Sequence, residues 1–334
     1  MQKLIGTISF LALVSCTTIS NHKKTEMQLT PAIHKVLDHL EKIQVFDAKD
    51  PLDQSRKYYE TMAFQLSGSK ESVALIEEVS IPADDHQISV RIYRPKGKSS
   101  KKSSAIIYLH GGWFISGSYE THDAIVRQLA NATGSDIIFI NYRLAPEHPF
   151  PAGLDDCKTV VEWLISNAET LEIDKNKLGI IGDSAGGALS GALATEIGDQ
   201  LKFQVLIYPA ADNSLNTASW ETYKNGPILN KEGGIQAWNW YLPNKEQQTN
   251  PLAVPILIKD FKNTPPTLIL LAEHDPLRDE GEQLSQHMKE SGVVVTTHFY
   301  KDMVHGFMHM GAILDETKTA VDEIAAFTHK NLEK

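Results

Sequence analysis

The sequence has few cysteines and no excess of positive charge. Its 334 residues include two cysteines and carry a formal net charge of −10, and its lysine runs are short and lie among polar residues. Nucleic acid is therefore not an expected partner. The lysines between Lys98 and Lys102 lie near glycine and serine residues, which predicts a solvated turn rather than a binding patch.

The N-terminal apolar stretch, from Leu4 to Val14, is too short to span a bilayer as a stable helix. Because Lys3 precedes it, the stretch is typical of an export signal that is not part of the fold. Its end, Leu13-Val14-Ser15-Cys16, resembles the lipobox of bacterial lipoproteins, which implies that Cys16 is lipidated and begins the mature chain. An ordinary cleaved signal with an incidental cysteine is the alternative.

We therefore expect a lipoprotein-type signal peptide at residues 1–16 and a polar tether at residues 17–30. The protein would be exported and anchored on the periplasmic or cell-surface face, with membrane contact through the lipid alone, because acyl chains can hold a soluble domain at a bilayer. Cys157 would then have no partner for an intrachain disulfide. Its position on the apolar face of a predicted helix indicates a core residue.

The rest of the chain suits one large α/β domain. Residues 87–93 alternate polar and apolar side chains, which predicts a half-exposed strand and an antiparallel opening to the sheet. After it, short apolar runs alternate with helical patterns, which predicts a doubly wound, mostly parallel sheet whose strands are covered on both faces. The predicted buried strands are residues 105–109, 137–140, 178–181, 203–207, 267–271 and 293–299.

Two segments, residues 27–69 and 213–261, do not fit this alternation, and the second is rich in tryptophan and tyrosine. We expect both to form a helical lid over the carboxyl ends of the strands, where open α/β sheets bind ligands. The predicted units are therefore an N-terminal part of a cap at residues 31–70, a cap insertion at residues 213–261, and a core made of residues 71–212 and 262–334.

The segment Gly182-Asp183-Ser184-Ala185-Gly186 follows a predicted strand and precedes a small-residue helix, which is the context of a G-x-S-x-G nucleophile elbow. The glycines are needed because a sharp strand-to-helix turn crowds its neighbours and strains the serine backbone. Ser184 is therefore the candidate nucleophile. The Ala185 N–H, at the start of the helix, is a candidate donor to the developing negative charge. A tight turn without catalysis is the alternative.

A second glycine motif, His110-Gly111-Gly112-Trp113, ends an earlier predicted strand, where oxyanion donors are expected in such a site. Glycines let backbone N–H groups approach the oxygen of a tetrahedral intermediate, and one such donor contributes about 10²- to 10³-fold in rate. The side chains of His110, Trp113, Phe114 and Asp183 are candidates for the wall of the substrate pocket. A glycine-containing loop with a structural histidine is the alternative.

The candidate base lies late in the chain, because the order in such a site is serine, acid and then histidine. His305 is the candidate because it begins a loop directly after a predicted strand, and His309 is the fallback. Glu273, Asp275 and Asp279 crowd the end of an upstream strand. Asp275 is the candidate acid, because capping of the next helix explains Asp279 without catalysis.

With these motifs in place, the chain resembles the bacterial hormone-sensitive-lipase family of carboxylesterases, from about residue 106 to residue 307. The matching motifs are His110-Gly111-Gly112, Asn141-Tyr142-Arg143-Leu144-Ala145-Pro146-Glu147, Gly182-Asp183-Ser184-Ala185-Gly186-Gly187, Asp275-Pro276-Leu277-Arg278-Asp279 and His305-Gly306-Phe307.

The resemblance implies an α/β-hydrolase core with a small helical cap, no cofactor and no metal, and hydrolysis of small-molecule esters with short or medium acyl chains through an acyl-enzyme. It implies Ser184, Asp275 and His305 as the triad. It also implies three backbone N–H groups as oxyanion donors, those of Gly111, Gly112 and Ala185.

One departure from the family pattern is Trp113, which stands where the family often has a third glycine. Its indole adds bulk near the acyl or alcohol pocket, so we expect esters of bulky tertiary alcohols to be poor substrates. Two other functions stay open. A carbohydrate (xylan-type) O-deacetylase is suggested by the lipoprotein signal and the aromatic segment. A non-catalytic ligand-binding hydrolase homologue is less expected, because such proteins usually lack a triad residue.

Overall fold

The computed structural model describes residues 29–97, 102–226 and 228–333. The predicted signal peptide, most of the tether and the candidate lipidation site Cys16 lie outside these residues. Among the described helices, none is both long and apolar enough to cross a membrane.

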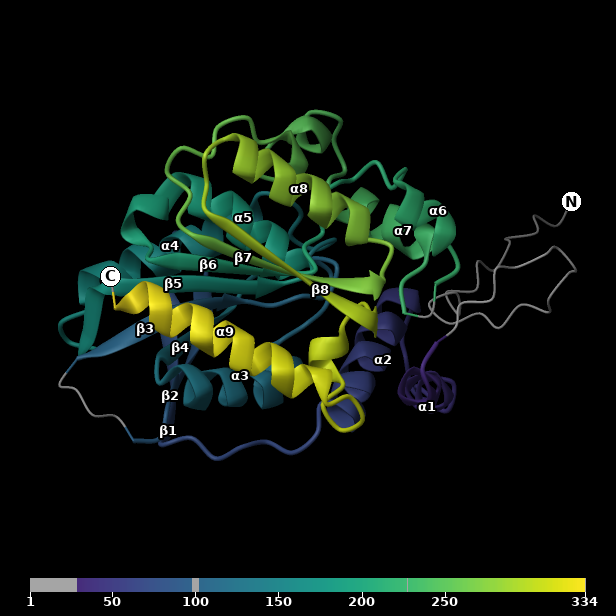
Figure 1. Cartoon of the computed structure of the whole chain (residues 1–334), viewed down its shortest axis with the longest axis horizontal. Helices are drawn as coiled ribbons and strands as arrows, with labels where there is room; N and C mark the ends of the chain where they lie inside the picture. Colours follow the sequence, from purple (N-terminus) through teal and green to yellow (C-terminus); the bar gives the residue numbers. More distant parts are fainter. Residues whose placement is uncertain (1–28, 98–101, 227, 334) are drawn as a thin grey trace, which may run out of the picture.

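An eight-stranded sheet runs through the middle of the molecule, with its strands in the order β1-β2-β4-β3-β5-β6-β7-β8 (Figure 1). The first two pairings, β1 with β2 and β2 with β4, are antiparallel, and all later neighbours are parallel. The strands are β1 Leu75–Pro82, β2 Gln87–Arg94, β3 Ser103–Leu109, β4 Asp136–Asn141, β5 Ile173–Asp183, β6 Phe203–Ile207, β7 Thr267–His274 and β8 Val295–Val304.

This architecture confirms the predicted fold class, including the antiparallel opening. The apolar runs became strands because both faces of the sheet are covered, and in β6 every residue is buried. The last strand is longer than the predicted 293–299 and ends at Val304, because its second half continues through a β-bulge that carries polar residues.

Helices cover the two faces of the sheet (Figure 1). Packing against one face are α3 (Tyr119–Thr133) and α9 (Glu316–Leu332), whereas α4 (Ala152–Asn167), α5 (Ala185–Ile197) and α8 (Arg278–Glu290) pack against the other. Each face has its own apolar core because successive side chains of a strand point to opposite sides.

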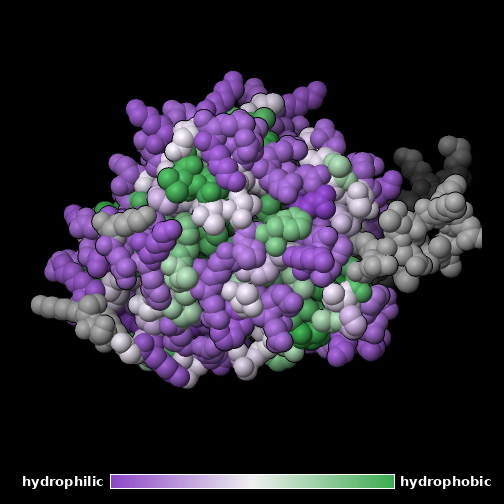
Figure 2. Space-filling view, viewed as in Figure 1, coloured by the Kyte–Doolittle hydropathy of each residue, from purple (hydrophilic) through white to green (hydrophobic). Residues whose placement is uncertain are grey.

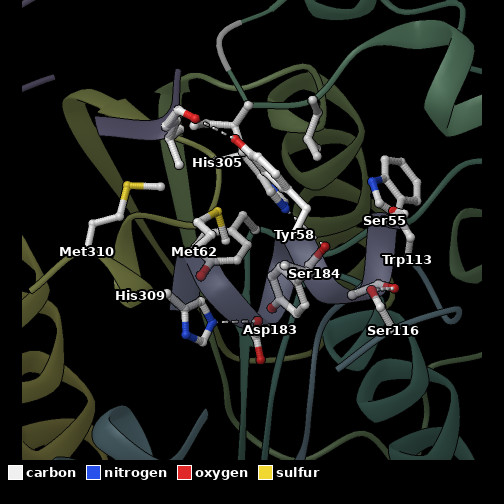
Figure 3. Close-up of a pocket in the computed structure, with 17 residues that line it drawn as sticks. Ser55, Tyr58, Met62, Trp113, Ser116, Asp183, Ser184, His305, His309 and Met310 are labelled. Carbon is white, nitrogen blue, oxygen red and sulfur yellow. Dashed lines mark hydrogen bonds and ion pairs between the residues drawn. The ribbon is translucent and has the colours of Figure 1, made fainter. Parts of the chain in front are cut away.

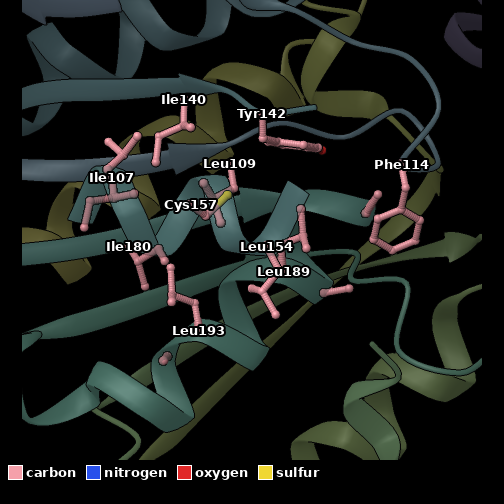
Figure 4. Close-up of a cluster of buried hydrophobic side chains, with 14 of the residues drawn as sticks. Ile107, Leu109, Phe114, Ile140, Tyr142, Leu154, Cys157, Ile180, Leu189 and Leu193 are labelled. Atoms are coloured by element: carbon pink, nitrogen blue, oxygen red, sulfur yellow. The ribbon is translucent and has the colours of Figure 1, made fainter. Parts of the chain in front are cut away.

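Cys157 of α4 is buried in one of these cores with a free thiol, as the sequence predicts. It packs among side chains of the sheet and of α5 (Figure 4). The face of the molecule drawn in Figure 2 is mostly hydrophilic, with scattered apolar patches.

Four helices lie near the carboxyl ends of the parallel strands (Figure 1). They are α1 (Pro31–Leu40) and α2 (Pro51–Leu66) from the N-terminal segment, and α6 (Ala218–Thr222) and α7 (Lys231–Tyr241) from the segment after β6. Each begins at a capping side chain, namely Thr30, Asp50, Thr217 and Asn230, which accepts a backbone N–H that the helix leaves unpaired.

Short 3-10 turns complete the described part of the chain: η2 Gly198–Gln200, η3 Gln247–Thr249, η4 Pro255–Leu257 and η5 Phe307–His309. The last of these follows β8 and places its residues at the same edge of the sheet as the four helices. The ends of β3, β5, β7 and β8 therefore meet at one edge, below helices that come from two distant parts of the sequence.

Candidate active site

Ser184 lies in a sharp turn between β5, which ends at Asp183, and α5, which begins at Ala185. Its φ of 54° is unusual for a residue with a side chain, and such strain is typical of functional turns. The flanking glycines are required by space. A Cβ on Gly182 would overlap the Gly186 carbonyl, and one on Gly186 would overlap the Leu109 carbonyl.

The side chains of Ser184, His305 and Asp275 form a continuous hydrogen-bonded chain. The Nε2 atom of His305 lies 3.0 Å from the Ser184 Oγ, and its Nδ1 atom lies 2.7 Å from the Asp275 Oδ2. All three residues are buried. Asp275 directly follows β7, His305 directly follows β8, and both strands deliver their residues to the edge where β5 ends.

The structure also shows how the acid is oriented. The second carboxylate oxygen of Asp275 accepts the Leu277 N–H at 2.8 Å, which fixes the carboxylate at the start of α8. Of the other carboxylates considered at this strand end, Asp279 accepts the Ser219 N–H and Glu273 accepts the Asp302 N–H. Neither of them has a hydrogen bond to His305.

His309, the fallback base, lies elsewhere in the site. Its Nε2 lies 3.1 Å from the Asp183 Oδ2 rather than on the serine hydroxyl (Figure 3). Burial lowers the pKa of His309, and the neighbouring Asp183 carboxylate opposes this shift only in part. The structure thus separates two histidines that are only four residues apart in the sequence.

Asp183 is a buried carboxylate with donors on both oxygens. Its Oδ1 accepts the Tyr108 hydroxyl at 2.9 Å and the Gly111 N–H at 3.0 Å, and its Oδ2 faces His309 and His122. Burial opposes ionisation, but the interactions with His122 and His309 outweigh it and hold the pKa of Asp183 well below its usual value. Asp183 therefore ties the glycine loop after β3 to the nucleophile turn.

This contact corrects one expectation about the oxyanion donors. The Gly111 N–H is already committed to Asp183, so it does not point freely at a substrate oxygen. Within the described ranges, the N–H groups of Gly112, Trp113 and Ala185 donate to no other group of the chain. Trp113 has a φ of 58°, a left-handed backbone conformation that glycine adopts more easily than a residue with a side chain.

The pocket beside Ser184 has walls from several elements. Met62 and Met310 lie on one side of the serine, and Trp113 and Ser116 lie on the other (Figure 3). The space open to a water-sized sphere is about 90 Å³. Other lining residues are Leu40, Ser55, Tyr58 and Tyr59 from the N-terminal helices and Tyr208, Ile228 and Leu229 from the segment after β6.

Two of the four residues predicted to form the pocket wall do not line the pocket. Trp113 and Asp183 line the pocket, but His110 and Phe114 lie behind it. His110 is fully buried and stacks on Tyr142 with ring centroids 4.2 Å apart, and burial lowers its pKa to about 3. Phe114 stacks on Tyr241 of α7, with ring centroids 3.8 Å apart.

The helix α2 is anchored to the site by an arginine that no motif identified. The Arg56 guanidinium donates to both carboxylate oxygens of Glu147, at 2.8 and 2.7 Å, and to the carbonyl oxygens of Ile115 and Ala145. Planar, paired contacts of this kind specify orientation as well as position. They hold α2 against the loop that carries Trp113.

A family model described as alpha/beta hydrolase fold matches residues 106–309 of the chain. The ethyl acetate hydrolase of Pseudomonas putida is 33% identical over 271 residues, which cover 79% of this chain and 85% of that protein. The arylesterase of Saccharolobus solfataricus is 32% identical over 286 residues, which cover 84% of this chain and 93% of that protein.

Among solved structures, a hyperthermophilic esterase from Pyrobaculum calidifontis is similar, with a TM-score of 0.83 and 34% sequence identity. The match covers 90% of this chain and 98% of that one.

Proposed function

The chain belongs to the alpha/beta hydrolase fold family, in its hormone-sensitive-lipase branch, and is a carboxylester hydrolase, and we propose that Ser184, Asp275 and His305 are its catalytic triad. The observation that carries this proposal is the unbroken chain of contacts from the serine hydroxyl through the imidazole to the carboxylate, at 3.0 and 2.7 Å.

In the proposed reaction, the Ser184 Oγ attacks the ester carbonyl carbon while the His305 Nε2 takes the hydroxyl proton. The Asp275 carboxylate stabilises the imidazolium that forms. When the tetrahedral intermediate collapses, the carbon–oxygen bond to the alcohol breaks and His305 returns the proton to the leaving alcohol. Water then attacks the acyl-enzyme by the same route and releases the acid.

The negative charge on the tetrahedral oxygen needs donors that are not already in use. The N–H groups of Gly112 and Ala185 stay the proposed pair, because they lie on the two loops that meet at Ser184 and donate to nothing else in the described chain. The Trp113 N–H takes the place of the Gly111 N–H as a third donor. Such prearranged donors act strongly because the buried site excludes water.

The proposed substrates are esters with short acyl chains. A space of about 90 Å³, where one water molecule needs about 10–15 Å³, accommodates several small groups beside the serine. Aromatic and apolar side chains such as Tyr58, Tyr208 and Leu229 form much of the wall, which suits uncharged acyl and alcohol groups. The Trp113 indole supports the further proposal that bulky tertiary alcohols are excluded.

The test is hydrolysis of p-nitrophenyl esters of increasing acyl length by purified protein and by Ser184→Ala. We expect turnover to fall from acetate or butyrate toward long chains, and Ser184→Ala to lose several decades of kcat. Ser285→Ala, which removes a buried hydroxyl that lies outside the pocket and is bonded to Thr297, is the matched control and should keep its activity. Residual activity of Ser184→Ala within tenfold of the wild type would refute the assignment.

A carbohydrate O-deacetylase is a weaker candidate than the sequence suggested. The tryptophan and tyrosine side chains that motivated it are mostly turned inward: Trp220, Trp238 and Tyr241 are all buried. Buried rings stabilise the packing of α6 and α7 and are not available to stack on a sugar. Acetylated xylan oligomers, run beside the p-nitrophenyl series, separate the two activities.

We also propose export and anchoring through a lipid on Cys16, on the strength of the lipobox resemblance. The protein would then reside on the periplasmic or cell-surface face of a membrane. Metabolic labelling with a fatty acid, followed by fractionation, tests this. Label and membrane association that survive Cys16→Ser would contradict it.

A further inference from the structure

Three potential metal ligands meet where β7 and β8 end, outside the pocket of Ser184. A carboxylate oxygen of Glu273, an imidazole nitrogen of His274 and a carboxylate oxygen of Asp302 all lie within 4.8 Å of one another. Neighbouring residues of a regular strand point to opposite faces, so Glu273 and His274 would not normally share a site.

A β-bulge explains why these side chains converge. Between the pairs Ala272↔Tyr300 and His274↔Val304, two residue steps on β7 face four on β8. Asp302, in the middle of the extra residues, has a φ of 61°, and its N–H donates to the Glu273 carboxylate at 2.7 Å. Bulges of this kind redirect side chains next to active sites.

The groups are available to a ligand. Among the described residues, neither the Glu273 nor the Asp302 carboxylate forms an ion pair, and the Nε2 of His274 has no hydrogen-bond partner. His274 is 9% exposed, so this nitrogen is also largely withheld from water. A buried polar atom without a partner is costly, and binding a cation would satisfy it and also neutralise two carboxylates that form no ion pair.

From this geometry we infer a binding site for one divalent cation of the zinc type, formed by Glu273, His274 and Asp302. The mixed set of one imidazole and two carboxylates suits Zn²⁺, whereas Ca²⁺ and Mg²⁺ prefer oxygen ligands alone. Neighbouring ligand atoms around a tetrahedral ion with bonds of about 2.0–2.2 Å lie about 3.4 Å apart. Rotation of the two half-buried carboxylate side chains closes the remaining difference.

The site lies directly beside the triad in the chain. His274 precedes Asp275, and Asp302 lies three residues before His305, so a bound cation would clamp the two strand ends that carry the acid and the base. Ester hydrolysis does not require this cation. The inference is therefore independent of the proposed catalytic mechanism and is tested by binding rather than by activity.

The other cluster with similar chemistry, formed by His122, Asp183 and His309, does not support a metal site. Its contacts are hydrogen bonds of 3.1 to 3.4 Å, and the same carboxylate also accepts the Tyr108 hydroxyl and the Gly111 N–H. Both oxygens of this carboxylate are therefore already in use, whereas in the bulge the His274 Nε2 has no partner and neither carboxylate forms an ion pair.

The test is isothermal titration of tag-free, chelator-dialysed full-length protein with Zn²⁺, with Ca²⁺ and Mg²⁺ as comparison ions. We expect one saturable site for Zn²⁺ and a melting temperature that rises with Zn²⁺ concentration, because the ion binds the folded state. His274→Ala and Asp302→Asn should each weaken Zn²⁺ binding by at least about tenfold, since even the partners of metal ligands matter that much.

The matched control is His298→Ala. His298 lies on β8, the strand that carries Asp302, and its Nδ1 lies 2.9 Å from a single carboxylate, that of Glu323. This variant should leave Zn²⁺ affinity unchanged. The Asp302→Asn variant keeps the side-chain size, so it guards against misfolding of the His274 variant. No saturable Zn²⁺ binding by the wild type, or wild-type affinity in either ligand variant, would overturn the inference.

Discussion

The Asp183→Asn substitution tests whether one buried carboxylate holds the two halves of the site together. The carboxylate accepts from Tyr108 and Gly111 on one oxygen and faces two histidines on the other. An amide of the same size has only one acceptor oxygen, so its NH₂ group must face one pair of donors. The change also removes the negative charge that strengthens every one of these bonds.

The expected magnitude follows from those contacts. A hydrogen bond to a charged group contributes about 1.5–3 kcal/mol, so losing the charge and one good acceptor should lower the free energy of unfolding by about 2–3 kcal/mol. If the Gly111 loop loses its tether, the neighbouring oxyanion donors shift. Since one such donor contributes about 10²- to 10³-fold, a partial misplacement should lower kcat about 10- to 100-fold with little change in KM.

The assay combines p-nitrophenyl butyrate kinetics with urea unfolding. Asp123→Asn is the matched control, because Asp123 is another buried carboxylate, bonded to Tyr93 and Arg127 away from the pocket. It should lose similar stability and keep its kcat. If Asp183→Asn retains kcat within threefold and unfolding free energy within about 0.5 kcal/mol, the tethering role is wrong.

The pH dependence of this difference has a definite sign. The pKa of Asp183 is depressed in the folded protein, so its contribution to stability is present above the unfolded value of about 3.9 and is lost as the pH falls through the folded value. The stability gap between wild type and Asp183→Asn should therefore be full at neutral pH and shrink only below about pH 4.

Four further substitutions probe other parts of the site. Trp113→Gly removes the strain of a left-handed backbone and removes the indole from the pocket. It should raise hydrolysis of tert-butyl esters at least about tenfold relative to ethyl esters. An unchanged ratio would show that another part of the pocket wall excludes tertiary alcohols. His305→Ala should cost at least about 10³-fold in kcat, whereas His309→Gln should cost less than about tenfold, as stopped-flow or steady-state rates will show; the reverse order would make His309 the base. A lysine at position 56 cannot keep the paired contact with Glu147. Arg56→Lys should therefore raise KM several-fold in kinetics and lower the free energy of unfolding in urea by about 1–2 kcal/mol. If KM and stability stay at the wild-type values, the Arg56 anchor is dispensable.

The sheet, and the meeting of Ser184, Asp275 and His305 at its edge, could be predicted because they depend on local patterns. A run of apolar residues before Gly182 indicates a buried strand, and the turn after it needs glycines for reasons of space alone. The chain order of serine, acid and histidine then reduces the choice. Selecting His305 over His309 as the candidate base rested on its place at a strand end; in the structure His305 lies beside the Ser184 hydroxyl, and His309 lies beside Asp183.

The remainder depends on contacts between distant residues. The commitment of the Gly111 N–H to Asp183 joins positions 72 residues apart, and nothing local to either residue signals it. Arg56 meets Glu147 across 91 residues, and its helix carries no motif. The inward direction of Trp220 likewise follows from its bond to the buried Glu280, which the sequence does not reveal.

Distant segments of the chain form the pocket wall, and the N-terminal one limits how far the gene can be shortened. Tyr58 and Met62 come from α2, and Arg56 on the same helix is bonded to the loop of Ile115. A truncated protein that started at β1 would keep every described strand and the side chains of Ser184, Asp275 and His305, but its serine would be exposed to bulk water. Shortening for crystallisation or expression should therefore stop before Thr30, the residue that caps α1.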